Sequence, residues 1–480
     1  MKSVLCFSVI FLSIIGCSKE IEDYIYIFTP TEITDSEPDF SDSDNNSPDL
    51  EDGKGDPSES KGGFSYSVPD VKTASDFAIK IYFDPDYTGE NSDGSIERPF
   101  TNMNVRFADA IPANTAFLFK RGTTHEKIGR LSNGSQLTRM IYNNNLIGAY
   151  GEGQNPVIEG IWVASNSDGL SIRDLNIQAE SQAGADAWDI IINLYGGDGS
   201  RPSNVTIAFN TLNGVYNPNG SWTSHSGPRP YPHMGIRGGG KGTVIYNNII
   251  SNVGDNGIYF DAHQGLQIVR NYIYNVNRMN WGRGLQHNVG GDCIQIAWSF
   301  CGAYVAGNYL DPGRDYYDLH PNGNDFWKHS YIANASPTGG WDSPTNGTIT
   351  EYNTFISPPT NTFGMGPVVY YNPPKNSVFR NNFIAPIKGI NGRVALAGSN
   401  YSVRDHLNQD EPHGIYDNIF IRHNSNQESS VTYPADDGLV TERGNLIFSS
   451  WSEYLEFIKD NDPVGSDIDP DDFWSGYTFK

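Results

Sequence analysis

The stretch Val205-Thr-Ile-Ala-Phe-Asn210-Thr-Leu212 has a pattern that recurs along the chain: alternating apolar residues, then asparagine, one further residue and an apolar one. Leu266-Gln-Ile-Val-Arg-Asn271-Tyr-Ile273 repeats it closely. The asparagines that we assign to this position are Asn210, Asn247, Asn271, Asn308, Asn353, Asn381, Asn418 and Asn445. Their separations are 37, 24, 37, 45, 28, 37 and 27 residues. The shorter intervals suit one coil of a parallel β-helix, and the longer ones suit a coil with an inserted loop.

These repeats predict an all-β chain folded as a right-handed parallel β-helix. Each coil has only short strands, so it is stable only when neighbouring coils stack and share one apolar interior. An asparagine at a fixed corner tolerates left-handed backbone geometry, and its amide can hydrogen-bond to the asparagine of the next coil. A sandwich or a propeller would require hairpin signals or regular blade lengths, and neither is evident.

The composition agrees with a large β-rich protein. The chain has 480 residues, of which 18% are charged and 12% aromatic, and it contains 51 glycines. This length is sufficient for a substantial core, and the glycine and aromatic content is typical of β structure rather than of helical bundles. The formal charge is -24, which argues against nucleic acid as a partner because phosphate would be repelled.

The N-terminus has the features of an exported lipoprotein. Lys2 precedes an apolar run at residues 4–15 that is too short to span a bilayer comfortably. Ile14-Ile-Gly-Cys17 resembles the lipobox of bacterial lipoproteins, in which the cysteine is lipidated after cleavage; an ordinary secretory signal is the alternative. Ser18-Lys-Glu-Ile-Glu-Asp23 resembles the surface-export signal of glycan-degrading Gram-negative bacteria. We therefore expect a lipid-anchored protein of the outer membrane, exposed at the cell surface, whose only membrane contact is the lipid on Cys17.

Residues 17–75 are expected to form a disordered acidic tether. Between Ser18 and Gly63 there are 14 Asp or Glu residues against 3 Lys. Such a segment buries too little apolar surface to offset the entropy lost on ordering. The other expected segments are a signal peptide, one β-helix domain with long inserted loops, and a C-terminal cap or tail, at residues 1–16, 76–450 and 451–480.

Two cysteines remain in the folded part, Cys293 and Cys301. In an oxidising compartment they could form a short-loop disulfide; two buried thiols stacked inside the coils are the alternative. No His or Cys cluster has zinc-ligand spacing, so the sequence predicts no structural zinc site. Calcium held by aspartates is the one cofactor left open, although no segment has the spacing of an EF-hand.

Four segments near the start of the folded part share features with a known group of proteins. They are Ile81-Tyr-Phe-Asp-Pro85, Ser92-Asp-Gly-Ser-Ile-Glu-Arg-Pro-Phe100, Phe117-Leu-Phe-Lys-Arg-Gly122 and Ile147-Gly-Ala-Tyr-Gly-Glu-Gly-Gln-Asn-Pro-Val-Ile158. They resemble the entry coils of pectate-lyase-like proteins, and the resemblance covers about residues 76–450. It implies a right-handed β-helix with an N-terminal helical cap, here at Val105–Ile111, and activity on polysaccharides as a lyase or a glycoside hydrolase. Fold analogy alone does not identify the chemistry.

Stacking of the coils predicts a strip of polar residues on one outward face. Arg237 and Asp261 each lie ten residues before the assigned asparagine, so we expect them to be neighbours on adjacent coils, about 4.8 Å apart. Strand alternation directs Met234, Ile236, Ile258 and Phe260 inward. The expected outward columns are Gly235, Tyr259, Gln295 and Lys328, beside Arg237, Asp261, Ala297 and Ser330.

Loops above this strip could supply further groups. Six of the ten histidines lie between residues 225 and 329. The alternative to a sugar-binding strip is an Arg–Asp ladder with solvated loop histidines. The loop residues that we predict to bind or act on a substrate are His233, His263, Arg283, His287 and His320.

Two chemistries fit such a strip. A lyase acting on uronic-acid chains needs a base near the proton next to the carboxylate, and positive groups that neutralise this carboxylate. Lys328, Tyr259 or a loop histidine would be the base, and Arg237 and Arg283 would neutralise the charge.

A glycosidase instead needs two carboxyl groups that flank the bond, and Asp261, Asp292 and Asp325 are the candidates. Gly291-Asp-Cys-Ile-Gln-Ile296 resembles the Asp-Asp-Cys-Ile segment of polygalacturonase-like hydrolases, but Gly291 replaces the first aspartate and no Gly-His-Gly or Arg-Ile-Lys segment follows. Asp292 has the alternative role of capping a corner. We therefore slightly prefer the lyase. The predicted catalytic residues are Asp261, Lys328, Asp292 and His263, and the predicted substrate-binding residues include Arg237, Tyr259, Gln295 and Asp325.

A non-catalytic surface glycan-binding protein or adhesin is the alternative of a different class. Exposed aromatic residues could stack on sugar rings without cleaving the chain. Convergent acid and base groups would favour an enzyme, and an aromatic platform alone would favour binding; the expected partner is a polysaccharide in both cases. The candidates are Trp222, Trp281, Trp298 and Trp341.

The anchor can be tested by the substitution Cys17→Ala. Without the thiol no lipid can be attached, so we expect the variant to remain soluble or unprocessed, whereas the wild-type protein should fractionate with membranes. Membrane retention that is unchanged in the variant would contradict the anchor.

Overall fold

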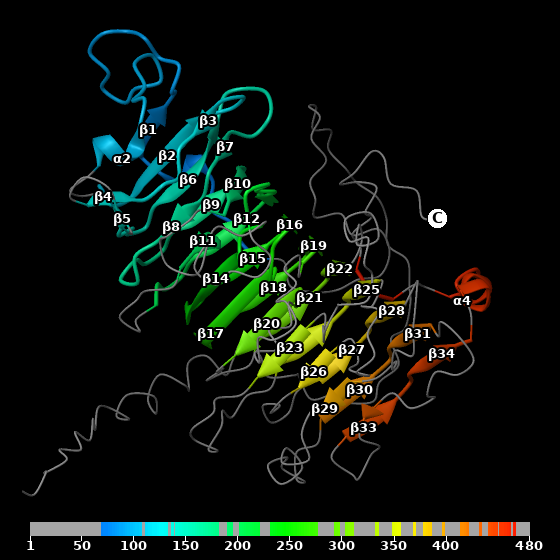
Figure 1. The fold of residues 1–480 in the computed structure, drawn as a ribbon. Coiled ribbons are helices and arrows are strands. Elements are labelled where there is room, and N and C mark those ends of the chain that lie inside the picture. The colour runs from blue at the N-terminus through cyan, green and yellow to red at the C-terminus, as the bar shows by residue number, and fades with distance from the viewer. Residues whose placement is uncertain are drawn as a thin grey trace, which may run out of the picture. The chain divides into compact units, whose positions relative to one another are not determined.

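Stacked parallel strands, ordered along the chain, make up nearly all of the regular secondary structure that is described (Figure 1). The chain is represented by a computed structural model, and Cys17 and the whole segment before residue 69 lie outside its described residues. The described residues are 69–107, 111–132, 136–138, 140–181, 190–194, 201–220, 231–276, 292–297, 303–311, 332–335, 348–356, 368–370, 378–385, 396–398, 413–421, 432–433, 440–449, 451–461 and 464–466.

The described strands form three parallel sheets, here called A, B and C. Sheet A contains β1 (Ile79–Phe83), β2 (Thr115–Lys120), β6 (Leu146–Tyr150), β9 (Ser171–Arg173), β12 (Thr206–Ala208), β15 (Val244–Tyr246), β18 (Gln267–Val269), β21 (Tyr304–Ala306), β24 (Ile349–Glu351), β27 (Val378–Arg380), β30 (His413–Tyr416) and β33 (Val440–Arg443). Sheet B contains β3 (Thr124–His125), β7 (Val157–Ile158), β10 (Asn176–Glu180), β13 (Thr211–Val215), β16 (Ile249–Ser251), β19 (Tyr272–Tyr274), β22 (Tyr309–Asp311), β25 (Thr354–Ile356), β28 (Phe383–Ala385), β31 (Ile419–Ile421) and β34 (Leu446–Phe448). Sheet C contains β8 (Ile161–Trp162), β11 (Ile190–Asn193), β14 (Met234–Lys241), β17 (Ile258–Gln264), β20 (Ile294–Ala297), β23 (Ile332–Ala335), β26 (Val368–Tyr370), β29 (Leu396–Gly398) and β32 (Thr432–Tyr433).

Each coil passes through the sheets in the order A, B, C before the next coil begins, as β12, β13, β14 and β15 do. Strands that are neighbours in a sheet therefore belong to successive coils, which is the defining property of a β-helix. Crossover connections between parallel strands are right-handed in nearly all proteins. The chain has the right-handed parallel β-helix fold that its asparagine repeats and its resemblance to pectate-lyase-like proteins predict, and this prediction is confirmed.

The core is a stack of apolar side chains in register. On sheet A, Ile207, Ile245, Ile268 and Val305 pair in sequence across β12, β15, β18 and β21, and all have 0% exposure. Full burial of one such side chain contributes roughly 1.5–3 kcal/mol. Because the period along a strand is two residues, a register slip of one would turn this whole row outward, and the core thus fixes the register.

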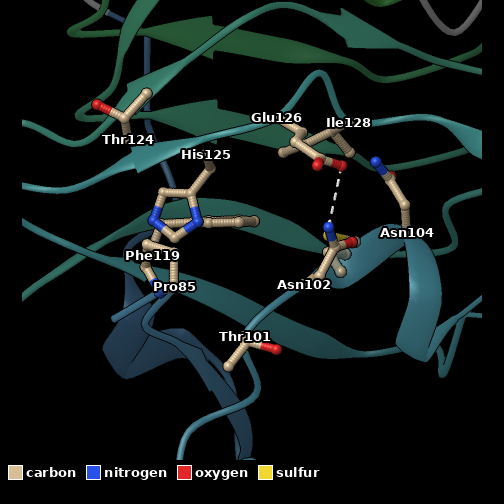
Figure 2. A pocket seen from close by; sticks show the side chains of 10 residues that line it. Pro85, Thr101, Asn102, Asn104, Phe119, Thr124, His125, Glu126 and Ile128 are labelled. Carbon is tan, nitrogen blue, oxygen red and sulfur yellow. Dashed lines mark hydrogen bonds between the residues drawn. The ribbon is translucent and has the colours of Figure 1, made fainter. Parts of the chain in front are cut away.

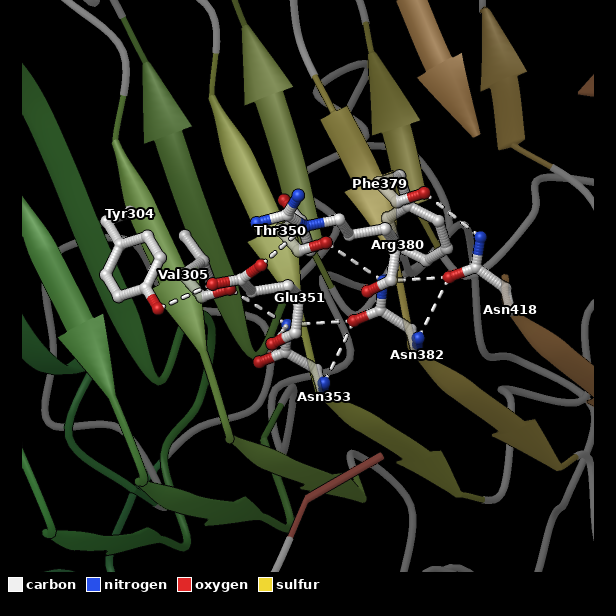
Figure 3. Close-up of polar contacts among 9 residues, drawn as sticks. All are labelled: Tyr304, Val305, Thr350, Glu351, Asn353, Phe379, Arg380, Asn382 and Asn418. Atoms are coloured by element: carbon white, nitrogen blue, oxygen red, sulfur yellow. Dashed lines mark hydrogen bonds and ion pairs between the residues drawn. The ribbon is translucent and has the colours of Figure 1, made fainter. Parts of the chain in front are cut away.

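Buried asparagines join successive coils at the corner between sheets A and B. The side-chain amide of Asn271 donates to Oδ1 of Asn308 at 3.0 Å, and Asn308 donates to Asn353 at 2.9 Å. Figure 3 shows how Asn353, Asn382 and Asn418 continue this row. Each amide also donates to backbone carbonyl groups, as Asn308 does to Ile268 at 2.9 Å. The members of this asparagine ladder are Asn210, Asn248, Asn271, Asn308, Asn353, Asn382, Asn418 and Asn445.

Two of the asparagines that we assigned to the ladder from the sequence are therefore one position too early. Asn247 and Asn381 each precede the true ladder residue, and both have the positive φ of the left-handed region, at 51° and 54°. The sequence pattern did not separate the two roles because each site contains two adjacent asparagines. The first two separations between ladder residues are therefore 38 residues, from Asn210 to Asn248, and 23 residues, from Asn248 to Asn271.

The left-handed backbone belongs to the residue before the ladder, not to the ladder itself. Phe209, Arg270 and Tyr352 occupy this position with φ of 58°, 53° and 54°. A bulky residue in this region is uncommon and costs of order 1 kcal/mol or more. The tight corner is thus held in place by the hydrogen bonds of the following asparagine.

Short helices lie near both ends of the described β-helix. Helix α2 (Met103–Arg106) is shorter than the predicted cap at Val105–Ile111, and its buried Met103 and the adjacent Phe107 pack on the first coil, where Phe107 lies 5.5 Å from Phe117 between ring centroids. The remaining elements are η2 (Ala74–Asp76), the antiparallel pair β4 (Arg130–Ser132) and β5 (Gln136–Thr138), and α4 (Trp451–Phe457). In the part of the chain described here, no helix is both long and apolar enough to cross a membrane.

Adjacent asparagines allow a matched test of the ladder. We expect Asn248→Ala to lower the free energy of unfolding by at least about 3 kcal/mol, because it removes several buried hydrogen bonds and leaves their partners unsatisfied. Asn247→Gly should change it by no more than about 1 kcal/mol, since glycine accepts the positive φ. Urea unfolding measures both values, and equal effects would contradict the assignment of Asn248 to the ladder.

Candidate functional site

The outer faces of the three sheets differ in what covers them. On sheet B, Tyr454 of α4 packs on Phe383 and Phe448, at 4.8 and 5.6 Å between ring centroids. The outer face of sheet A has an apolar cluster around Tyr246 and Val269. It also has a carboxylate, Glu351, whose two oxygens are occupied by Tyr304 and Arg380, as Figure 3 shows.

Sheet C presents polar and aromatic side chains in a row on its outer face, and sheet A has a second such row in Glu351, Arg380, Tyr416 and Arg443. The backbone register of sheet C aligns, on five successive coils, the residues that we call the outer column: Trp162, Asn193, Arg237, Tyr259 and Gln295. The connections that lead from sheet B into this face are long, for example from Val215 to Met234 and from Tyr274 to Ile294. Long inserted loops at the edge of a rigid sheet are a common setting for binding and catalysis.

The predicted inward and outward directions of the side chains in β14 and β17 are confirmed. Ile236 and Phe260 have 0% exposure and lie in the core, whereas Arg237 and Tyr259 between them are partly exposed. Arg237 pairs with Tyr259 on the next coil, and its guanidinium carbon lies 5.7 Å from the centroid of the tyrosine ring. A cation and an aromatic ring at this distance attract each other, which orients both groups.

The predicted pairing of Arg237 with Asp261 is wrong. Asp261 instead accepts hydrogen bonds from Arg201, at 2.9 Å from Nη2 and 3.1 Å from Nε, and the two side chains are 13% and 10% exposed. The predicted register failed for two reasons. The count began from Asn247 rather than Asn248, and β14 has an irregularity between Gly238 and Gly240 that shifts its pairing with β17.

Gly239 makes the Arg201–Asp261 ion pair sterically feasible. A Cβ at Gly239 would lie 2.3 Å from the carbonyl oxygen of Asp261 and 2.9 Å from Cδ and Nε of Arg201. Any side chain here would therefore clash with the backbone of the next coil and displace the guanidinium group. Arg201 has no signature in the sequence as the partner of Asp261, because it lies 60 residues away and outside the repeat pattern.

Gln295 follows Tyr259 in the register, as predicted, and its Oε1 accepts a hydrogen bond of 3.0 Å from Asn256. The next position is occupied by Ala333, so Lys328 does not take the predicted place beside Gln295. Asp292 is buried, with 5% exposure, and its backbone N–H donates to Asn256 Oδ1 at 2.8 Å. This burial argues against direct contact of Asp292 with a substrate.

His233 is buried rather than placed in a loop above the strip. It is 1% exposed, and its Nε2 lies 3.0 Å from Oδ2 of the equally buried Asp255. The backbone explains this position, because Asp255 N–H donates to the carbonyl of His233 and Gly254 N–H to that of Pro232. The segment before β14 is thus part of the stacked coil, and the prediction that His233 contacts substrate is corrected.

Several predicted site residues are not tested by the structure. His263 lies in β17, where its backbone pairs with Gly240. The remaining predicted groups lie outside the described residues: Arg283, His287, His320, Asp325, Lys328, and the tryptophans Trp222, Trp281, Trp298 and Trp341.

Trp162 and Asn193 extend the face beyond the predicted strip. The ammonium group of Lys127 lies 4.9 Å from the centroid of the Trp162 ring, and Asn193 stands between Trp162 and Arg237 in the register. Sequence analysis missed both because the asparagine repeat that set the count begins later, at Asn210. The Ile161-Trp162 alternation before a glycine-bounded turn was the only available signal.

Neither a metal nor a reactive thiol is indicated by the described residues. Among them, no group of three or more His, Cys, Asp or Glu side chains could hold a metal ion. Cys293 is a buried free thiol, which agrees with the buried-thiol alternative for this residue, and burial raises its pKa well above the usual value. A thiol that remains protonated is a poor nucleophile, so Cys293 is a core residue. Cys301 lies outside the described residues.

A double-mutant cycle tests the corrected pairing. We expect Arg201→Ala and Asp261→Ala to show a coupling energy of about 1 kcal/mol or more in unfolding measurements, because each single variant leaves a mostly buried charge without its partner. Arg237→Ala combined with Asp261→Ala should be additive. Coupling of Asp261 to Arg237 rather than to Arg201 would restore the register predicted from the sequence.

Comparison with solved structures finds carbohydrate-active enzymes of low overall similarity. A GH136 lacto-N-biosidase from Eubacterium ramulus is 14% identical over 77% of this chain and 68% of its own, with a TM-score of 0.39. A pectate lyase is 11% identical (78% and 82% covered, TM-score 0.32), and a mannuronic-acid-specific polysaccharide family 6 lyase from human gut microbiota is 13% identical (74% and 86%, TM-score 0.35). A scan against protein-family models and a search of curated proteins found no match. At these scores the chemistry has to be inferred from the site itself.

Proposed function

We propose that this protein is a polysaccharide-cleaving enzyme, a lyase that acts on a glycan containing uronic acid, and that the outer column of sheet C is its substrate face. The observation that supports this proposal is the Arg237–Tyr259 pair on adjacent coils, in a row that also presents Trp162, Asn193 and Gln295. Neighbouring positions in the row are about 4.8 Å apart. This spacing lets two coils contact one sugar ring.

The roles follow from the chemistry of β-elimination. A base removes the proton from the carbon that bears the carboxylate, the electron pair forms a double bond in the ring, and the glycosidic oxygen leaves from the next carbon and takes up a proton. The guanidinium group of Arg237 would neutralise the carboxylate and so make this proton more acidic. The hydroxyl of Tyr259, whose ring lies under that guanidinium group, would transfer the proton. Lys328 and His263 remain predicted alternatives for the base.

The rigid frame favours this arrangement. Both groups project from strands whose inward neighbours, Ile236 and Phe260, are fully buried. Their positions are therefore set by the stacking of the core before substrate binds, and little entropy is lost on binding.

The carboxyl groups of the described face fit a hydrolase less well. A glycosidase needs two carboxyl groups with access to the bond. In the described part of sheet C, Asp261 is bound by Arg201 and Asp292 is 5% exposed. This difference favours the lyase over the hydrolase alternative.

We further propose that lipid on Cys17 and the acidic segment 17–75 hold the enzyme at the outer-membrane surface. The lipobox-like sequence and the acidic composition support this location. A flexible chain of this length has a root-mean-square span of about 40 Å. The tether would let the β-helix reach polysaccharide at a distance from the lipid surface.

The function can be tested with a panel of uronic-acid glycans, read by ultraviolet absorbance of unsaturated products and by reducing ends. We expect Arg237→Ala and Tyr259→Phe each to lower turnover by about 100-fold or more without unfolding the protein, because both side chains point away from the core. Tyr216→Phe and Arg98→Ala are matched controls at exposed positions and should be neutral.

The outcomes separate the three hypotheses. Unsaturated products that are lost in Arg237→Ala and Tyr259→Phe support the lyase. Reducing ends without ultraviolet absorbance indicate a hydrolase, and glycan binding without either product indicates an adhesin. Full activity in both variants would remove the outer column from the active site.

A further inference from the structure

A cavity of about 200 Å³ opens on the first coil, outside the outer column (Figure 2). It lies between the segment that begins α2, the end of β2 and the residues in and after β3. Nothing in the proposed lyase chemistry uses it. Its lining residues are Pro85, Thr101, Asn102, Met103, Asn104, Phe119, Thr124, His125, Glu126 and Ile128.

Hydrogen bonds determine the tautomer of His125. The hydroxyl of Thr123 donates its single proton to the carbonyl of Lys120 at 2.7 Å, so its oxygen must act as the acceptor towards His125 Nε2, which lies 2.8 Å away. His125 therefore carries its proton on Nε2, and Nδ1 is left as an acceptor. Burial lowers the pKa of His125 to about 4, against the opposing effect of Asp84 and Asp86, so the ring is neutral near neutral pH.

The polar wall of the cavity is rich in acceptors. Figure 2 shows Glu126 beside Asn102, whose Nδ2 donates to Glu126 Oε2 at 3.0 Å. This bond leaves Oε1 of Glu126 available for a ligand. The hydroxyl groups of Thr101 and Thr124, which are both exposed, can donate or accept a hydrogen bond. None of the lining residues carries a positive charge near neutral pH.

The lining also includes apolar residues, and the volume is small. Pro85 is partly exposed and supplies carbon surface against which the C–H face of a ring could pack, whereas Met103, Phe119 and Ile128 are only 1–3% exposed. A volume of about 200 Å³ equals that of roughly seven water molecules at ~30 Å³ each. This is room for one sugar ring.

We propose that this cavity is a second binding site, which takes a single neutral sugar ring and rejects uronic acids. A ligand that donates several hydroxyl protons matches Glu126 and Nδ1 of His125. A carboxylate at about 4 Å from Glu126 would be repelled by about 1 kcal/mol in bulk water and by about 4 kcal/mol near a protein surface. The cavity thus disfavours a negatively charged ligand, whereas the region around Arg237 attracts one.

Its position suits a substrate that combines both kinds of sugar. Glu126 lines the cavity, and the next residue, Lys127, lies over the Trp162 ring at the start of the outer column. A glycan whose uronic acids lie along the column could place a neutral sugar in the cavity. The cavity site itself does not depend on the proposed lyase activity.

The test measures binding of monosaccharides to the full-length protein by saturation-transfer NMR and calorimetry near neutral pH. The neutral probes are D-glucose, D-galactose, L-rhamnose, L-fucose and D-xylose, and the charged probes are D-galacturonate and D-glucuronate. We expect at least one neutral sugar to bind with a dissociation constant on the order of 1 mM. The uronates should bind at least about tenfold more weakly.

Two variants locate the binding. Thr124→Tyr should fill the cavity and abolish binding, whereas Thr211→Tyr, on a strand of the same sheet B outside the cavity, should not. Glu126→Gln should keep neutral-sugar binding and reduce the discrimination against uronates, whereas Glu159→Gln, an exposed carboxylate outside the cavity, should change neither.

Loss of binding in Thr124→Tyr with the thermal midpoint retained supports the site, as does uronate binding gained in Glu126→Gln. The proposal is overturned if no neutral sugar binds the wild-type protein, if uronates bind equally well, or if a folded Thr124→Tyr variant binds as the wild type does. Cleavage of uronic-acid glycans is measured separately, so the lyase proposal can fail while this one holds.

Discussion

The rest of the structure depends on hydrogen bonds between asparagine side chains of successive coils. Each ladder amide bonds to the next asparagine and to backbone carbonyls at the corner between sheets A and B, as Asn308 does. Water cannot substitute for these bonds, because Asn308 has 0% exposure. A buried amide without its partners would be unfavourable by several kcal/mol in total, so the coils from Asn210 to Asn445 all present an asparagine at the same height. The coil before them has Leu175 at this position, and its backbone N–H donates to Oδ1 of Asn210. The stacking of the core then follows in a single register.

Much of this fold could be predicted from the sequence because its determinants are local. The alternation around Asn210 and Asn271 is visible within eight residues, and a separate alternation in β14 and β17 correctly identifies the inward residues Ile236 and Phe260. The identity of the ladder residue was ambiguous only where two asparagines are adjacent, as at Asn247 and Asn248. There the two asparagines differ only in backbone conformation, and because their side chains are identical the sequence does not reveal which one has the positive φ.

The site was harder to predict because its contacts cross coils. The neighbour of Arg237 is Tyr259 rather than Asp261 because the ladder residue is Asn248, not Asn247, and because β14 has one irregular step. The true partner of Asp261, Arg201, comes from a connection between coils, and its approach requires the missing side chain of Gly239. The burial of His233 depends on pairing of its backbone with Asp255. None of these facts has a periodic signature in the sequence.

The short corner between sheets A and B has a consequence for how such a protein can change over evolution. Only two residues separate Ala208 from Thr211 or Val269 from Tyr272, and the ladder leaves no freedom in their number. The connections into sheet C have no such constraint, and they vary from coil to coil. Insertions and deletions can therefore accumulate beside the outer column while the frame beneath stays constant. New binding specificities can arise by exchange of these segments, one coil at a time, without any change in the residues that determine the fold.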